Sequence, residues 1–169
     1  MLLSPPTTSK APATIASPAP SPSSPLLDRR IEVTAAGLPY SYAKQLYSIS
    51  KDNAATIIDY IAAMNSEVNL SDNYRKDVIE LLFRFSKYND NKPFKDLIRT
   101  NIIGFLETYR KTEAQDPMHK WIGTYNIFRI HLLRFFKWLY YPDIEPNKRP
   151  KPSMLDKYCS TAQKRKVNL

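Results

Sequence analysis

The sequence is poor in the residues that build reactive or metal-binding centres. Its 169 residues include one cysteine, two histidines and three glycines. The single cysteine, Cys159, cannot form an intramolecular disulfide, which excludes a secreted disulfide scaffold and fits a reducing compartment. His119, His131 and this distant cysteine lack the spacing of zinc ligands, and three glycines are too few for a glycine-rich phosphate loop. We therefore expect no metal and no cofactor.

Long apolar runs are also missing. No window of the sequence approaches the roughly 18 apolar residues of a transmembrane helix. The opening Met-Leu-Leu-Ser-Pro-Pro lacks the basic start and the sustained apolar stretch of a signal peptide. We expect a soluble cytoplasmic protein without a membrane partner and, since no nucleotide or metal motif is visible, without a small-molecule substrate.

A third absence is local and concerns acidic residues. Between Asp116 and Asp143 the chain has 26 residues, 117–142, without one carboxylate. The cations of this stretch are Lys120, Arg129, Arg134 and Lys137. Surface helices usually mix signs in pairs four residues apart, and no such pair can form here. A basic helix face can be an ordinary solvated face, but like charges kept together without acids favour an anionic partner.

The charge of the chain is polarised along its length. The net charge is +9. Residues 31–83 hold four cations and seven acids (−3), whereas residues 84–137 hold eleven and five (+6). Residues 148–169 add seven cations against one acid. Such an asymmetry produces a directed field that attracts a polyanion such as nucleic acid.

Apolar residues recur at helical spacing in four segments. These segments are residues 52–65, 71–88, 100–111 and a last segment that starts at Gly123 and Thr124 and stops before Pro142. Ser71 or Asp72 is the expected N-cap of the second segment, Thr100 of the third and Thr124 of the fourth. No stretch shows the period-two alternation of a strand. The sequence predicts an all-α protein, a four-helix bundle.

The remaining segments are predicted to flank this bundle. Seven of the fourteen prolines fall within the first 27 residues, among Ser, Thr and Ala, a composition that cannot offset its ordering entropy by burial. The expected organisation is a disordered Pro/Ser/Ala-rich tail, an arm or short helical turn packed on the domain, a helical domain and a basic tail: residues 1–30, 31–50, 51–147 and 148–169.

Three sequence segments resemble a known protein family. They are DPMHKWIGTYN (116–126), LRFFKWLYYP (133–142) and EPNKRP (145–150). Together with the four helical patterns, they are similar to the SAM-like core-binding domain of tyrosine recombinases of the phage-integrase type, and look closest to archaeal integrases. The resemblance covers about residues 50–150. It implies one half of a C-shaped clamp around DNA, with strand cleavage left to a separate domain that carries Arg, His and Tyr.

The catalytic half of that family is not expected in this chain. Only 17 residues, 153–169, follow Pro152, far fewer than a catalytic domain needs. The string His131-Leu-Leu-Arg134 matches the family's His-x-x-Arg pattern, but it falls inside the last predicted helix. We therefore expect no catalytic residues and no enzyme activity.

The resemblance also implies which side chains face the duplex, since the second and fourth helices of the family do so. The matching DNA-binding candidates are Arg84, Lys87, Lys120, Thr124, Tyr125, Asn126, Arg129 and Lys137. Most would contact phosphates, and Thr124 with the first amides of its helix suits a phosphate oxygen. Arg129 and Asn126 are best able to reach base edges.

The expected function is therefore DNA binding associated with site-specific integration or recombination, by a truncated or split integrase. Its partners would be double-stranded DNA and a full-length recombinase, which places the protein at the nucleoid. The alternative is a helical protein-interaction module with a proline-rich leader.

Overall fold

The computed structural model describes residues 25–153, and these residues form an all-α protein, as predicted. No strand occurs among them. Most of the two predicted tails, residues 1–24 and 154–169, lies outside the described residues. The elements are α1 (Pro25–Thr34), α2 (Tyr40–Tyr47), α3 (Lys51–Val68), α4 (Asp72–Tyr88), η1 (Phe94–Asp96), α5 (Arg99–Glu107), α6 (Trp121–Tyr140) and η2 (Pro146–Lys148).

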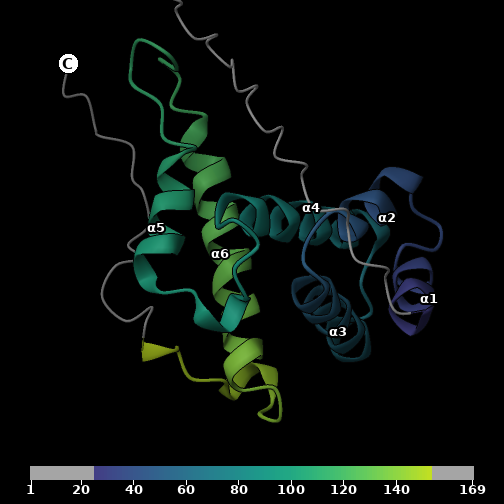
Figure 1. Ribbon diagram of the computed structural model, residues 1–169. Helices are drawn as coiled ribbons and strands as arrows, with labels where there is room; N and C mark the ends of the chain where they lie inside the picture. Colours follow the sequence, from purple (N-terminus) through teal and green to yellow (C-terminus); the bar gives the residue numbers. More distant parts are fainter. Residues whose placement is uncertain (1–24, 154–169) are drawn as a thin grey trace, which may run out of the picture.

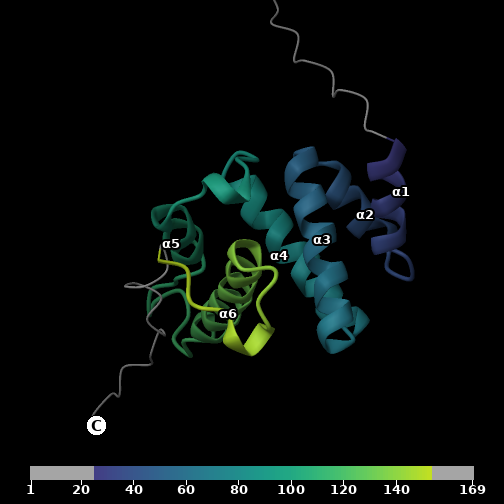
Figure 2. The ribbon, with the colours of Figure 1, turned by 90° about the horizontal axis from the view of Figure 1, so that it is seen from below.

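Helix α4 joins two groups of helices. Figure 1 shows α5 and α6 side by side on one flank, and α1, α2 and α3 on the other, with α4 crossing between them. The view from below in Figure 2 shows the same division. Helix α4 contacts α2 and α3 as well as α6, while α5 packs on α6. The acidic and basic halves of the sequence thereby become two sides of one molecule.

The first two long helices begin at serine caps. The Ser50 hydroxyl accepts from the Asn53 amide at 3.4 Å, and the Ser71 hydroxyl accepts from the Tyr74 amide at 3.3 Å. A serine in this position satisfies one of the unpaired amides of the first turn. The predicted Ser71 cap is thus confirmed. Helix α3 is longer than the predicted 52–65 and ends at Asn69, whose left-handed conformation is a common helix stop.

Two helices occupy the region predicted as tail and arm. Residues 25–30 form the start of α1 and do not belong to a disordered tail. Each of these short helices has a deeply buried anchor, Ile31 in α1 and Leu46 in α2. Helices of eight to ten residues are marginal alone, so packing onto α3 and α4 decides their formation. Gly37, at φ +77°, turns the chain between them, a conformation that glycine adopts without strain.

The start of α5 differs from the prediction. Thr100 lies inside the helix, and the N-cap position is Ile98. The Ile98 amide donates to the Asn101 side chain at 3.0 Å, so a residue of the helix itself satisfies the amide at the N-cap position. The helix also ends at Glu107, before the predicted 111.

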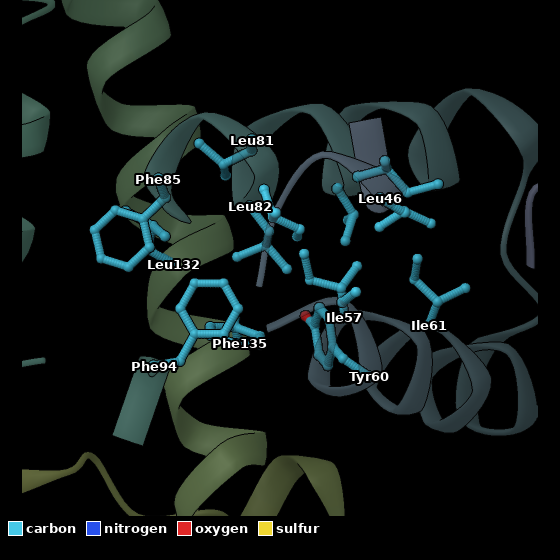
Figure 3. Packing of buried hydrophobic residues seen from close by; sticks show 14 of the residues in the cluster. Leu46, Ile57, Tyr60, Ile61, Leu81, Leu82, Phe85, Phe94, Leu132 and Phe135 are labelled. Carbon is cyan, nitrogen blue, oxygen red and sulfur yellow. The ribbon is translucent and has the colours of Figure 1, made fainter. Parts of the chain in front are cut away.

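Aromatic rings hold α3, α4 and α6 together. Phe135 of α6 contacts Tyr60 of α3 edge-on, with ring centroids 5.2 Å apart, and contacts Phe94 at 5.0 Å. Figure 3 shows these rings meeting beside Phe85 of α4. Edge-to-face pairs of this kind add about 0.5–1.5 kcal/mol to the burial itself. Trp138 packs at the margin of the same cluster.

A buried polar network ties α3 to α4. The Asn53 amide nitrogen donates to the Ser86 hydroxyl at 2.8 Å and to the Lys92 carbonyl at 3.0 Å. Its oxygen accepts from the Phe94 amide at 3.2 Å. The Asn53 side chain therefore joins α3 to the last turns of α4, to the loop that follows α4 and to the start of η1.

The described part of the predicted basic tail is also ordered. Lys148 pairs with Glu145, and Arg149 is buried against Glu67 of α3. Residues 148 and 149 thus belong to the domain. Within residues 25–153, no helix combines the length and apolarity that a membrane span requires.

Candidate nucleic-acid interface

A groove of about 310 Å³ lies between α4 and α6. Its apolar floor is formed by side chains such as Leu81 and Phe128, and its rim is polar. The lining residues are Asp77, Glu80, Leu81, Arg84, Thr124, Ile127, Phe128 and His131. Arg84 and Thr124, two of the predicted DNA-binding residues, are therefore brought to one groove from the two helices that the sequence singled out.

The α4 side of the groove mixes both signs of charge. Asp77, Glu80 and Arg84 are spaced three and four residues apart, which places them on one helix face. Arg84 forms an ion pair with Glu80, and both side chains are well exposed. An exposed pair of this type contributes only about 0.3–0.5 kcal/mol. Arg84 can therefore exchange this carboxylate for another anion at small cost.

His131 faces the groove from α6. Its ring lies against Tyr74 of α4, with centroids 5.1 Å apart. Burial lowers the pKa of His131 below its ordinary value, and the charge of Arg134 lowers it further, while Asp77 acts in the opposite direction. At neutral pH the imidazole is uncharged and adds no positive charge to this surface.

The N-terminus of α6 differs from the prediction in a way that affects function. The helix begins at Trp121, so Thr124 is an interior residue and does not cap it. The Trp121 amide donates to the Asp116 carboxylate at 2.8 Å. The next two amides donate to the carbonyls of His119 and Lys120, both at 3.1 Å. The predicted phosphate site on the first amides is wrong, because these donors are already satisfied and a carboxylate lies there.

Tyr125 is the clearest wrong prediction among the site residues. Its side chain is only 8% exposed and belongs to the core cluster, next to the ring of Trp121. Seven residues separate Tyr125 from the buried Leu132, about two helical turns, so the two share the core face. Tyr125 packs the domain and does not reach an external partner.

The predicted residues of α6 do not share one face. At about 100° per residue, Thr124 and Arg129 lie roughly 140° apart around the helix axis. Thr124 faces the groove with α4. Asn126 and Arg129 are half-buried on the other flank, and both already have interactions within the protein. The α4–α6 groove therefore does not include the two side chains proposed for base reading.

The three lysines among the candidates lie in three places. Lys87 donates to the Ser48 carbonyl at the end of α2, where a cation also complements the helix dipole. Lys120 is exposed just before α6. Lys137 lines a pocket of about 230 Å³ together with Arg134 and, from α3, Glu67.

The sequence prediction omitted Arg134 and the acidic side of the groove. Arg134 is exposed on α6 and donates to the Tyr74 hydroxyl at 3.5 Å. The spacing of Asp77, Glu80 and Arg84 could have identified the acids, since a helix places such residues together. Within residues 25–153, no group of three His, Cys, Asp or Glu side chains could hold a metal ion.

Comparisons of this chain with family models, with curated proteins and with solved structures find no match. The resemblance to the core-binding domain of tyrosine recombinases therefore stays a prediction.

Proposed function

We propose that this chain binds double-stranded DNA through the side of the molecule formed by α4 and α6, as the DNA-binding half of an integrase-type recombination system. Strand cleavage would be supplied by another polypeptide, such as a full-length recombinase. The proposal follows from charge and its placement, and it uses the groove only as the meeting point of the two helices.

The observation that carries the proposal is the unbalanced charge of α6 and its approach. Lys120, Arg134 and Lys137 form no ion pair with an acid of residues 25–153. Helix α6 itself contains no Asp or Glu. In a protein whose exposed charges are mostly mixed, such a row of cations is completed by an external anion. A polyanion with regularly spaced charges, such as a nucleic-acid backbone, can engage all three.

Arg84 and Thr124 suit phosphate contacts at the centre of this surface. The guanidinium offers several donors in a fixed fork, and the threonine hydroxyl can donate to a phosphate oxygen. Glu80 pairs with Arg84, so a phosphate at Arg84 would replace that carboxylate, whereas Asp77 lies about one turn before Glu80 in α4 and opposes close approach there. DNA would therefore lie over Arg84 and the basic side of α6.

The test is a fluorescence anisotropy titration of a random duplex. The variant Lys120→Gln/Arg134→Gln/Lys137→Gln removes three cations, and we expect its affinity for the duplex to fall by about tenfold or more. The plot of log K against log salt should also become less steep, by about 2–3, since each phosphate contact contributes roughly 0.9 to the slope. The matched control, Arg29→Gln/Lys44→Gln/Lys51→Gln, removes the same charge from α1, α2 and α3, outside the proposed surface. Equal losses in the two variants would show a nonspecific charge effect and refute this surface.

A protein-interaction module remains the second candidate because α6 also exposes apolar side chains. Ile127 and Ile130 are exposed on this helix, and Ile127 borders the groove. Neither isoleucine side chain can form a favourable polar contact with a phosphate. If the wild-type protein binds duplex and heparin and Lys120→Gln/Arg134→Gln/Lys137→Gln does not, the result supports the DNA proposal. If the wild-type protein binds neither at low salt, the result favours a protein partner for this face.

A further inference from the structure

We propose that the groove between α1 and α2 binds the chain's own proline-rich leader, residues 1–24, in an extended polyproline II conformation. This inference does not depend on DNA binding. It concerns the end of the molecule that lies away from α5 and α6 in Figure 1.

The groove has small side chains between exposed tyrosines. Its volume is about 570 Å³, and the lining residues are Glu32, Ala35, Ala36, Gly37, Leu38, Tyr40, Ala43 and Tyr47. Tyr40 is 77% exposed, an unusual state for so large an aromatic side chain on a short helix. Tyr47 is partly exposed and donates weakly to the Asp28 carbonyl, at 3.4 Å. Both rings therefore have faces available for packing.

Aromatic walls around a smooth floor are the usual surface for polyproline II segments. Such segments dock in aromatic-lined grooves because proline rings pack flat on aromatic faces and the extended backbone loses little entropy on binding. Alanine and glycine on the floor let a backbone approach closely. The Tyr40 hydroxyl can donate to a carbonyl of the segment, since these carbonyls have no partners within a polyproline II helix.

The leader has the required sequence and the required reach. It ends at Ser24, immediately before Pro25 opens α1, and contains prolines on alternate positions at Pro18, Pro20 and Pro22. Helix α1 has 10 residues, about 15 Å. The leader can span about 75 Å in polyproline II at 3.1 Å per residue, so it can turn back along α1 and still fill the groove.

Charge also favours this occupant over a nucleic acid. Glu32 is the only carboxylate or cation that lines the groove, and it forms no ion pair within residues 25–153. The Arg75 guanidinium donates to the Ala36 carbonyl beside the groove, but its charge is paired with Asp72. A polyanion would be repelled by Glu32. Residues 1–24 contain one cation, Lys10, and no acid. A leader in the groove could therefore place Lys10 near Glu32.

Paramagnetic relaxation in the full chain tests the proposal. Cys159→Ser removes the native thiol, and Ser9→Cys places a nitroxide label next to Lys10. Because tethering gives an effective concentration in the millimolar range, we expect about half or more of the peak intensity at the Gly37 and Ala43 amides to be lost relative to the reduced label. The Gly123 amide, on α6, should keep its intensity.

Variants separate specific docking from random contact. The variant Tyr40→Ala/Tyr47→Ala should restore the intensities of the Gly37 and Ala43 amide peaks. The control Tyr88→Ala removes a half-exposed tyrosine elsewhere and should not restore them. Circular dichroism checks that each variant is helical. Should Tyr40→Ala alone fold where the double variant does not, it provides the same comparison. Broadening that survives loss of Tyr40, or that spreads evenly over the domain, overturns the proposal. Broadening seen only between labelled and isotopically enriched copies assigns the groove to a second chain and overturns it too.

Discussion

Arg149 and Glu67, 82 residues apart in the sequence, form a partly buried ion pair that holds the segment after α6 against the end of α3. The Arg149 side chain is 5% exposed and that of Glu67 is 19% exposed. One guanidinium nitrogen, Nη1, lies 3.2 Å from Glu67 Oε2, and Nε donates to the carbonyls of Tyr141 and Ile144 at 3.1 and 2.8 Å. The arginine thus fixes the path of residues 141–149 by hydrogen bonds that hydrophobic side chains could not replace.

Arg149→Met should lower the free energy of unfolding by about 2–3 kcal/mol, since removal of the arginine leaves a partly buried carboxylate and several carbonyls unpaired. Urea denaturation measures the change. Lys148→Met is the matched control: its pair with Glu145 is exposed, and we expect a change within about 0.5 kcal/mol. Similar values for the two variants would mean that the Arg149 network does not stabilise the fold.

Asn53→Ala should cost about 2–4 kcal/mol of stability, because the Phe94 amide and the Lys92 carbonyl lose their partner in a buried site. Asn73→Ala, at an exposed position of α4, is the control and should change stability by less than about 0.5 kcal/mol. Thermal and urea unfolding measure both. A small effect of Asn53→Ala would show that the loop after α4 can satisfy these groups in another way.

His131 should make stability depend on pH. Since burial lowers its pKa in the folded state, the unfolded chain binds more protons below the unfolded value of 6.5. Stability from this group is therefore complete above about pH 6.5 and is lost as pH falls from there through the lowered folded pKa. The facing groups Tyr74, Asp77 and Arg134 stay in place in His131→Asn. The difference in unfolding free energy between wild type and this variant, followed from pH 7.5 to 5, should shrink; a constant difference contradicts the assignment.

Asp116 should stabilise α6 and weaken the binding of DNA. Asp116→Ala removes the acceptor of the Trp121 amide and should cost about 1 kcal/mol of stability. It also removes a negative charge beside Lys120, so duplex affinity at low salt should stay equal or rise. Glu113→Ala, in the exposed loop before α6, removes the same charge without a helix contact and should leave stability within about 0.5 kcal/mol. A loss of DNA affinity specific to Asp116→Ala would contradict this prediction and show that DNA binding needs the Asp116 contact with the first turn of α6.

The candidate site was predictable only in part, and particular residues show why. Arg84 and Thr124, both predicted to face DNA, line one groove in the structure, although their role in DNA binding stays a prediction. The prediction for Tyr125 was wrong because a tyrosine can lie at the surface or in the core, and only its packing beside Trp121 shows that this one is in the core. Arg149 was assigned to a basic tail because its acidic partner is far away in the sequence.

By itself, the sequence determined the helical character of the chain, the serine cap of α4 and the uneven distribution of charge, because helix periodicity, capping and net charge depend on residues close together along the chain. Only the tertiary structure decided that α1 and α2 form, that Arg149 is buried and that the cations of α6 divide between two flanks. Those outcomes depend on which helix faces meet, and burial and ion pairing join groups that are distant in sequence.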